Sequence, residues 1–368
     1  MKDYYDITVI GAGINGVAIS KNLANTGKKV LVIEKNHIAS GASSHSSKLI
    51  HGGLRYLEQF EFFLVKESLQ NQKYLLDTYP DLVKLRPFYL PIYKDSKRPL
   101  WLISLGLWIY SFFSKHGHHA LKVSKDDFCK KFTAIKKDNL KAVFKYFDGK
   151  TDDRLLTCKV AKEAQDLGVD ILENTQLEEL YISDESIDIK TSNGCTKSNV
   201  LINATGAWID EINDKFNLPS SYSIEKLSGI HIVIDKLLIP EPLILETESK
   251  RIFFIIPELT TTYIGTTERQ EITNIDDIKV NSKDIEYLLY QSNKYLKTPL
   301  KTKDIKEVYI GTRPLIKSQK QTTMMSREYK LDLHKIGKNN ILHIYGGKLT
   351  TFASLAKKTV DLLKKIEK

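Results

Sequence analysis

The chain has 368 residues, of which 42% are hydrophobic and 27% are charged. This length and balance exclude a largely disordered protein and allow two domains with substantial cores. The excess of lysine and arginine over acidic residues gives a net charge of +10. Such a charge favours an anionic partner, which could be nucleic acid, acidic lipid headgroups or a phosphorylated small molecule.

The cysteines and the N-terminal residues both indicate a cytoplasmic protein. Cys129, Cys158 and Cys195 lie far apart in the sequence and have neither CxxC nor metal-ligand spacing. We therefore expect three buried thiols and no metal site. The first residues lack the basic, apolar and small-residue segments of a signal peptide.

The chain begins with a strand, helix and strand pattern. Residues 5–10 (YDITVI) and 29–33 (KVLVI) are typical of buried strands, and residues 13–25 of a helix between them. Apolar residues then recur at helical spacing over 60–76, and a short strand is expected near 88–90. This start indicates a βαβ unit.

Residues 100–113 (LWLISLGLWIYSFF) form the longest apolar run of the sequence. The run is shorter than the roughly 20 residues that a membrane-spanning helix needs. It is rich in Trp, Tyr and Phe, is preceded by Lys97 and Arg98, and is followed by three histidines. This pattern favours a helix lying in a membrane interface. The alternative is a buried helix that lines a substrate domain.

The middle of the chain alternates strands and helices, which is typical of a parallel sheet covered by helices. The expected elements are a strand at 142–147, a helix at 154–167, paired strands at 177–182 and 186–190, a buried parallel strand at 199–203 and a following helix.

The last third begins with an alternating, β-rich pattern between about 216 and 304, which suggests a separate antiparallel layer. The expected elements are strands at 230–235, 251–256 and 261–267, a helix near 285–295, a buried strand at 341–345 and a final helix at 350–365. Because no repeat or flexible linker separates these parts, we expect the domains to be interleaved.

The GxGxxG motif at residues 11–16 lies between the first strand and the first helix, where it has a physical meaning. Gly11 permits a tight turn, Gly13 lets backbone N–H groups approach a pyrophosphate, and Gly16 lets the helix and strand pack closely. Glu34 ends the second strand, where an acid can hold a ribose hydroxyl. Together they predict a bound dinucleotide.

Two further buried strands end in glycine-containing turns, at residues 203–206 (NATG) and 346–348 (GGK). By analogy with FAD folds, such strands returning to one sheet suggest FAD rather than NAD, with the isoalloxazine near the last turn. The predicted fold class is therefore α/β, with a Rossmann-like FAD-binding domain interleaved with an antiparallel β-rich substrate domain.

The motifs together resemble a known family over essentially the whole chain. They are, in order, GAGINGVAI, SSKLIHGGLRYLE, TDDRLL, NATGAW, IGTT, GTRPL and GGKLTT. Their order and spacing resemble those of the FAD-dependent glycerol-3-phosphate dehydrogenases of the aerobic, quinone-linked type. The resemblance implies a flavoprotein fold like those of glutathione reductase and D-amino-acid oxidase. Members usually carry a further C-terminal helical domain, which we expect to be absent here.

The resemblance implies oxidation of sn-glycerol 3-phosphate to dihydroxyacetone phosphate, with a hydride passing from C2 to flavin N5 and electrons passing to quinone or dioxygen. It also suggests how the chain is divided. The FAD-binding domain is expected at 1–85, 150–215 and 305–368, and the substrate-binding domain at 86–149 and 216–304. We expect a cytoplasmic protein, peripheral on the inner face of the cell membrane, with no nucleic-acid partner because the lysines are dispersed.

Hydride loss from an alcohol requires a base for the hydroxyl proton. His51 is the first candidate for this base and His231 the second. Lys348, at the turn next to the flavin, is expected to hold the developing alkoxide or the charge at flavin N1. These three residues are the predicted catalytic group.

A dianionic phosphate requires fixed cations and hydrogen-bond donors. The predicted substrate-binding residues are Arg55, Tyr56, Thr266, Thr267 and Arg313. The predicted cofactor-binding residues are Gly11, Gly13, Ile14, Asn15, Gly16, Glu34, Lys35, Ser43, Ser46, Ser47, Lys48, Ala204, Thr205, Gly206, Gly346, Gly347, Lys348, Leu349 and Thr350.

A few positions depart from the family's usual motifs near the expected substrate site. Ser228 and Ile230 replace parts of a KGSH-like approach to the histidine, Glu268 replaces an aspartate, and Ala353 replaces an arginine. These changes keep a second substrate open, namely a different phosphorylated or acidic secondary alcohol.

Overall fold

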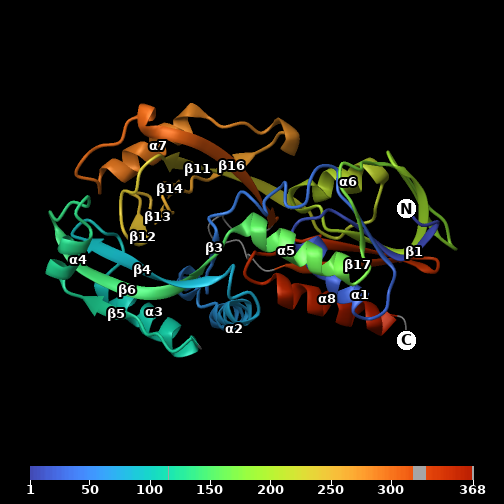
Figure 1. Ribbon diagram of the computed structural model, residues 1–368, viewed down its shortest axis with the longest axis horizontal. Coiled ribbons are helices and arrows are strands. Elements are labelled where there is room, and N and C mark those ends of the chain that lie inside the picture. The colour runs from blue at the N-terminus through green and yellow to red at the C-terminus, as the bar shows by residue number, and fades with distance from the viewer. Residues whose placement is uncertain (115, 318–328, 367–368) are drawn as a thin grey trace.

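The computed structural model describes residues 1–114, 116–317 and 329–366. Its strands form two sheets, one toward the N-terminal β1 and one beneath α7 (Figure 1). The predicted division into an α/β part and a β-rich part is therefore observed as two sheets.

The first sheet has the strand order β17-β18-β10-β1-β2-β7. Its parallel strands are β1 (Tyr4–Ile10), β2 (Val30–Ile33), β7 (Asp170–Leu172), β10 (Gly194–Asn203) and β18 (Asn339–Tyr345). Antiparallel strands extend it, namely β17 (Lys330–Ile336) beside β18, and the hairpin of β8 (Leu177–Ile182) and β9 (Ile187–Thr191) beside β10. The three glycine-ended strands predicted to share one sheet thus do so, and their carboxyl ends meet at one edge.

Helices cover this sheet because their apolar faces pack on its buried strands. They are α1 (Ile14–Ala24), α5 (Asp153–Asp166) and α8 (Phe352–Ile366), with α1 in contact with both others. Val17, Val160 and Leu355 belong to one fully buried apolar cluster with strand residues such as Val32. Figure 1 shows the three helices together near the C-terminus.

The second sheet has the order β15-β11-β14-β13-β12-β4-β6-β3, with β16 beside β11 and β5 beside β6. The strands are β3 (Leu49–Ile50), β4 (Lys84–Tyr93), β5 (Leu121–Val123), β6 (Leu140–Lys150), β11 (Ile224–Ile234), β12 (Leu243–Glu246), β13 (Ile252–Pro257), β14 (Thr262–Gly265), β15 (Arg269–Glu271) and β16 (Ile305–Ile316). The remaining α-helices of the described residues are α2 (Phe62–Thr78), α3 (Leu100–Phe113), α4 (Lys125–Lys131), α6 (Ile209–Phe216) and α7 (Ser282–Asn293), of which α6 packs on the first sheet.

Strand pairing shifts two of the expected domain boundaries. β3 pairs with β6 and β16 pairs along its length with β11, so both lie in the second sheet although their residues were assigned to the FAD-binding part. β16 was not predicted because its residues are mostly half-buried and its sequence lacks a clear apolar alternation. Arg313, which lies on β16, is thereby brought to the second sheet.

The cysteines also differ from the expectation. Cys129 and Cys158 are half-buried and Cys195 is exposed, so the prediction of three buried thiols was wrong. Cys195 lies near the start of β10, where the strand leaves the core and pairs only with β9. The continuously buried residues of β10 lie at the other end of the strand, away from Cys195.

The apolar helix α3 is only partly buried. Leu107 and Tyr110 are buried, whereas Trp101, Trp108 and Phe112 have exposed fractions of 68%, 66% and 73%. Among the described residues, no helix is both long enough and apolar enough to cross a membrane. One face of α3 therefore packs on the fold and the other faces outward.

Candidate active site

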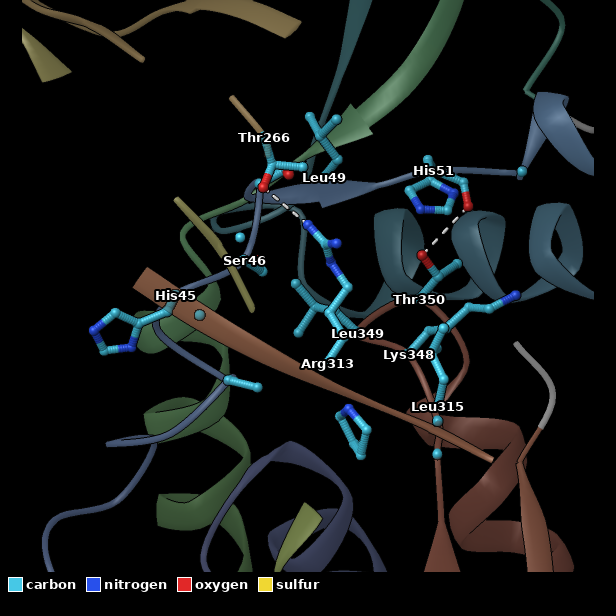
Figure 2. Close-up of a pocket in the computed structure, with 18 of the residues that line it drawn as sticks. His45, Ser46, Leu49, His51, Thr266, Arg313, Leu315, Lys348, Leu349 and Thr350 are labelled. Carbon is cyan, nitrogen blue, oxygen red and sulfur yellow. Dashed lines mark hydrogen bonds between the residues drawn. The ribbon is translucent and has the colours of Figure 1, made fainter. Parts of the chain in front are cut away.

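A cavity of about 730 Å³ is lined by elements of both sheets. Its wall runs from the N-terminus of α1 through the loop of residues 40–58 to α3, and includes β11, β16 and the turn at 346–350. Figure 2 shows residues from these segments gathered around one space. The volume and mixed apolar and polar lining are typical of a cofactor and substrate site.

The predicted dinucleotide motif has the geometry that its glycines imply. Gly11 has a φ of +100°, and a Cβ at Gly16 would lie 2.0 Å from the carbonyl oxygen of Gly11. Glu34 is buried and its two carboxylate oxygens accept hydrogen bonds from the N–H groups of Ala12 (2.8 Å) and Asn36 (2.9 Å). Gly13 is the N-cap residue of α1 and makes no side-chain cap hydrogen bond itself. This cradle fits the pyrophosphate and ribose of FAD.

Polar residues extend the cradle along the cavity wall. The Ser43 hydroxyl accepts a hydrogen bond of 3.0 Å from the N–H of Ile14. Asn15 Nδ2 donates to the carbonyl of Gly346 (3.3 Å), which ties the first turn to the last. The ammonium of Lys35 pairs with Asp276 at 2.8 Å. The remaining predicted cofactor residues that line the cavity are Gly11, Gly13, Ser46, Ser47, Ala204, Thr205, Gly206, Gly347, Lys348, Leu349 and Thr350.

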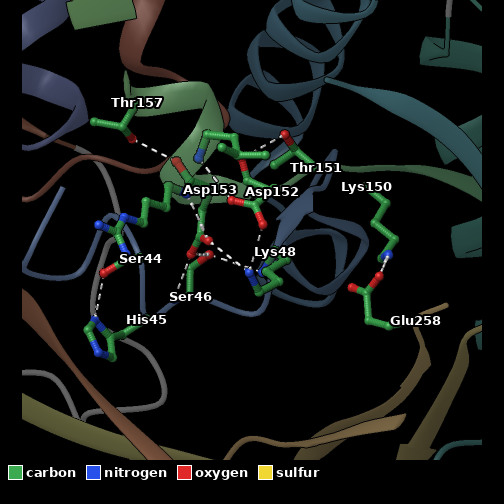
Figure 3. A network of polar contacts seen from close by, with 12 residues as sticks. Ser44, His45, Ser46, Lys48, Lys150, Thr151, Asp152, Asp153, Thr157 and Glu258 are labelled. Atoms are coloured by element: carbon green, nitrogen blue, oxygen red, sulfur yellow. Dashed lines mark hydrogen bonds and ion pairs between the residues drawn. The ribbon is translucent and has the colours of Figure 1, made fainter. Parts of the chain in front are cut away.

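Lys48 is the exception within this loop. It does not line the cavity, and its ammonium lies 3.3 Å from the carboxylates of both Asp152 and Asp153 (Figure 3). Asp153 is fully buried and also accepts hydrogen bonds from the N–H and hydroxyl of Ser46. The ammonium of Lys48, which was predicted to contact the cofactor, is thus held outside the cavity by this buried carboxylate.

Asp152 caps the start of α5. Its carboxylate accepts a hydrogen bond of 2.9 Å from the N–H of Leu155, in the first turn of α5. The acidic pair at residues 152 and 153 therefore fixes both the helix start and the serine-rich loop.

The proposed catalytic residues Lys348 and His51 line the same cavity. The ammonium of Lys348 lies 4.1 Å from the ring centroid of Tyr56, and among the described residues it has no hydrogen-bond partner although it is buried. The Thr350 hydroxyl donates to the carbonyl of His51 over 3.3 Å (Figure 2). An ammonium in this state can donate a hydrogen bond to a ligand oxygen or attract a negatively charged ring.

Four of the five predicted substrate-binding residues line the cavity and one does not. Arg55, Tyr56, Thr266 and Arg313 line the cavity, and Arg313 Nη2 donates to the Thr266 hydroxyl over 2.9 Å. Thr267 does not line it, and its buried hydroxyl accepts a hydrogen bond of 3.0 Å from the N–H of Ile230. Thr267, which was predicted to contact the substrate, thus lies outside the cavity lining, and its hydroxyl bonds to the backbone of β11 instead.

His231 also lines the cavity, and its ring contacts Ser47 and Tyr309. Its Nε2 lies 3.0 Å from the Ser47 hydroxyl and its ring stacks on Tyr309, with centroids 4.9 Å apart. Burial, and then the charges of Arg313 and Lys48, lower the pKa of His231 to about 3. A general base works best with a pKa near the working pH, so the environment of His231 favours His51 as the base.

Arg251 and Asp148 are two of the charged residues of the cavity that sequence reasoning missed. Arg251 Nη2 pairs with Glu268 at 3.0 Å, and both line the cavity beside Arg313. Asp148, at the end of β6, also lines it and is buried. The one available signal for Asp148 was its position at the end of an apolar strand; nothing in the sequence marked Arg251.

Comparison with known proteins gives one family. The family model described as FAD dependent oxidoreductase matches residues 6–362. The chain is 35% identical over 374 residues to the aerobic glycerol-3-phosphate dehydrogenase of Escherichia coli (strain K12), covering 97% of this chain and 73% of the relative. It is 33% identical to the D-erythritol 1-phosphate dehydrogenase of Brucella abortus (strain 2308), covering 98% of this chain and 74% of the relative.

A solved structure supports the same fold. The glycerol-3-phosphate dehydrogenase of Bacillus halodurans, solved as a complex with FAD, superposes with a TM-score of 0.78 at 24% identity. The match covers 99% of this chain, which spans 65% of the length of that structure. The predicted flavoprotein fold is confirmed.

Proposed function

Because the chain belongs to the FAD-dependent oxidoreductases and, within them, to the glycerol-3-phosphate dehydrogenase family, we propose that it oxidises sn-glycerol 3-phosphate to dihydroxyacetone phosphate. Bound FAD supplies the hydride acceptor, at N5. The observation that carries the proposal is the buried ammonium of Lys348, without a hydrogen-bond acceptor among the described residues, in one cavity with His51 and Arg313.

In this proposal His51 removes the proton from the C2 hydroxyl while C2 gives up its hydride. The developing alkoxide needs a positive partner that is already in place, and the ammonium of Lys348 meets this need. The ring of Tyr56, 4.1 Å away, stabilises that ammonium by a cation–π contact. The result is a ketone, with the proton held by His51.

The phosphate is assigned to the arginines. Arg313 and Arg55 both line the cavity, and a guanidinium matches a phosphate with two parallel hydrogen bonds. The Thr266 hydroxyl fixes one nitrogen of Arg313, which reduces the freedom that the side chain would lose when the phosphate binds. Arg313 therefore serves orientation as well as charge.

The direct test mixes flavin-loaded protein with glycerol 3-phosphate without oxygen and follows the visible flavin absorption. We expect the absorption to bleach, and dihydroxyacetone phosphate to appear in equal amount. Glycerol without phosphate is the control and should bleach the flavin far more slowly. Full retention of the colour with glycerol 3-phosphate would exclude this substrate.

A longer phosphorylated polyol is the second candidate. The chain is similar to a D-erythritol 1-phosphate dehydrogenase, and Glu268 lines the cavity beside Arg313 in its pair with Arg251. A carboxylate there accepts hydrogen bonds from additional hydroxyl groups. The anaerobic test with D-erythritol 1-phosphate decides, since faster bleaching than with glycerol 3-phosphate would favour this second substrate.

We further propose that electrons leave through quinone rather than dioxygen. The supporting observation is the apolar part of the cavity wall, which includes Leu102, Ile103 and Ile109 of α3 and Ile252 of β13. Such a wall suits an apolar acceptor. Reduced protein is mixed with a soluble quinone or with aerated buffer, and faster reoxidation by oxygen would contradict the quinone assignment.

Finally, we propose that α3 docks the protein on the inner face of the cell membrane. Phe60 and Phe63, which precede α3 in the chain, are exposed by 79% and 90%, and Trp108 stacks with Phe112 on the outward face of α3. Lys66 and Lys97 are exposed nearby in sequence. Apolar side chains with basic neighbours bind anionic lipid surfaces.

The docking proposal is tested by sedimentation with anionic liposomes at low salt. The double substitution Trp108→Ser with Phe112→Ser should leave most of the protein in the supernatant, whereas the wild type should sediment. Tyr181→Ser, at an equally exposed aromatic residue of β8, is the matched control and should sediment as the wild type does. Equal sedimentation of all three would contradict docking through α3.

A further inference from the structure

A buried carboxylate lies directly behind the turn that carries His51. Asp148 is 3% exposed, and its Oδ1 accepts hydrogen bonds from the N–H of Gly52 (3.0 Å), the hydroxyl of Tyr110 (2.8 Å) and Nε2 of Gln72 (2.6 Å). These donors come from the loop after β3, from α3 and from α2. One oxygen atom thus joins three segments at the residue next to His51.

The backbone on both sides of His51 is held by this group. Gln72 Nε2 also donates to the carbonyl of Ile50 over 2.7 Å, so the contacts bracket His51 at residues 50 and 52. From the opposite side, the Thr350 hydroxyl donates to the His51 carbonyl. The backbone position of His51 is therefore determined by hydrogen bonds before, at and after the residue.

The packing around Gly52 leaves little room for a side chain. A Cβ at Gly52 would lie 2.3 Å from Cδ2 of Leu69 and 2.4 Å from the Tyr110 hydroxyl. Gly53 has a φ of +79°, a left-handed conformation that favours glycine. The two glycines therefore let the backbone lie against Tyr110, close to the Asp148 contacts.

We propose that Asp148 is the positioning residue for His51, holding the proton acceptor at the reacting hydroxyl through the N–H of Gly52 and, with Gln72, the carbonyl of Ile50. The proposal rests on the proposed function, in which His51 is the base. Asp148 itself does not exchange a proton with substrate in this role. The residue acts through the backbone, so its loss should slow the chemical step more than it weakens substrate binding.

The chemistry of the group agrees with this role. Burial raises the pKa of the Asp148 carboxyl to about 7, against the lowering caused by the hydrogen bonds from Tyr110 and Gly52. A buried carboxyl is costly to a fold unless its bonds are used. A neutral carboxyl and a carboxylate both offer Oδ1 as an acceptor to Gly52, so the positioning contact does not need the charge.

The test measures flavin reduction by substrate in Asp148→Ala and Asp148→Asn proteins, per bound flavin. A displaced base costs about 100-fold in rate, so we expect Asp148→Ala to lower kcat by about that factor with little change in KM. Asn keeps an acceptor oxygen, so Asp148→Asn should recover about tenfold or more of the loss. The control, Asp332→Asn, changes an equally buried acid on β17 and should leave kcat unchanged.

A milder variant complements the substitutions of Asp148. Tyr110→Phe removes only the hydroxyl that meets Asp148 and Gly52, and should lower kcat by about threefold to tenfold. If Asp148→Ala does not fold, Tyr110→Phe decides alone. Unchanged kcat in every Asp148 and Tyr110 variant that folds would overturn the proposal, as would a failure of Asn to recover any of the loss.

The nitrogen-15 NMR signals of the His51 ring, assigned by comparison with His51→Gln, test the position of His51 without any substrate. They should shift in Asp148→Ala and in Tyr110→Phe, which remove contacts to the turn, and not in Asp332→Asn. A ring that is unshifted in each of the first two variants that folds would overturn the proposal. If the wild type is not reduced by glycerol 3-phosphate, the proposed function fails, while the NMR shift still decides the role of Asp148.

Discussion

Arg313 Nη2 donates a hydrogen bond of 2.9 Å to the Thr266 hydroxyl, and Arg313 Nη1 lies 3.9 Å from the carboxylate of Glu268. The arginine is thus oriented by one neutral and one acidic partner, on a strand that crosses the second sheet. A guanidinium fixed in this way can exchange its weak contact to Glu268 for a substrate phosphate.

Arg313→Ala should raise the KM for glycerol 3-phosphate by about 10- to 100-fold, because a charge-assisted hydrogen bond to phosphate is lost. Thr266→Val should have a smaller effect, since it removes only the orienting contact. Flavin content, measured by absorbance, should be unchanged in both variants. A parallel loss of FAD would mean that Arg313 belongs to the cofactor site.

Lys348 and Lys48 provide a matched pair of partly buried lysines. Lys348→Met should lower kcat/KM by about 100-fold, because a preplaced positive group is removed. Its free energy of unfolding should be equal or higher, since the buried ammonium has no hydrogen-bond acceptor among the described residues.

Lys48→Met should change the free energy of unfolding in the opposite direction. It leaves the fully buried Asp153 without its cation, and should lower the free energy of unfolding by about 2 kcal/mol. Urea unfolding and flavin reduction measure the two quantities. Destabilisation by Lys348→Met alone would contradict the assignment of its ammonium to a ligand.

The dinucleotide part of the fold could be predicted because its signals are local. The GxGxxG turn, the acid at Glu34 and the apolar strands each lie within a few residues of sequence. The second sheet was predicted only in part, because β16 has no regular alternation and carries Pro314 near its end. Its partner β11 determines its place, and that pairing joins segments about 80 residues apart.

The site residues were likewise predicted where the signal is local and missed where it depends on distant contacts. His51, Arg313 and Lys348 were found because each lies in a recognisable motif, and all line one cavity. Asp148 was not found, since its donors lie 38, 76 and 96 residues away. Thr267 does not line the cavity beside Thr266, because its hydroxyl accepts a hydrogen bond from the N–H of Ile230, a contact that the sequence does not reveal.

Glu34 gives a test of the cofactor cradle. Both of its oxygens accept hydrogen bonds from backbone N–H groups, so Glu34→Gln places an amide N–H₂ against a donor. We expect Glu34→Gln and Glu34→Ala to raise the Kd for FAD by a similar factor, about 10- to 100-fold. Recovery of flavin fluorescence on dissociation measures this.

The matched control for Glu34 is Glu173→Gln. Glu173 accepts a hydrogen bond from the N–H of Ile38 but does not line the cavity, and its substitution should leave the Kd unchanged. A normal Kd for Glu34→Gln would mean that the carboxylate does not contribute to binding.

His231 makes stability depend on pH. Burial, and then the charges of Arg313 and Lys48, lower its pKa to about 3 in the fold, against about 6.5 for an unfolded chain. Between these values the unfolded chain binds more protons, so the free energy of unfolding falls as pH falls through this window. His231→Gln should reduce that dependence by up to about 1.4 kcal/mol per pH unit, measured by urea unfolding. His37→Gln, at an exposed histidine, should keep the wild-type slope, and equal slopes in all three proteins would contradict a neutral His231.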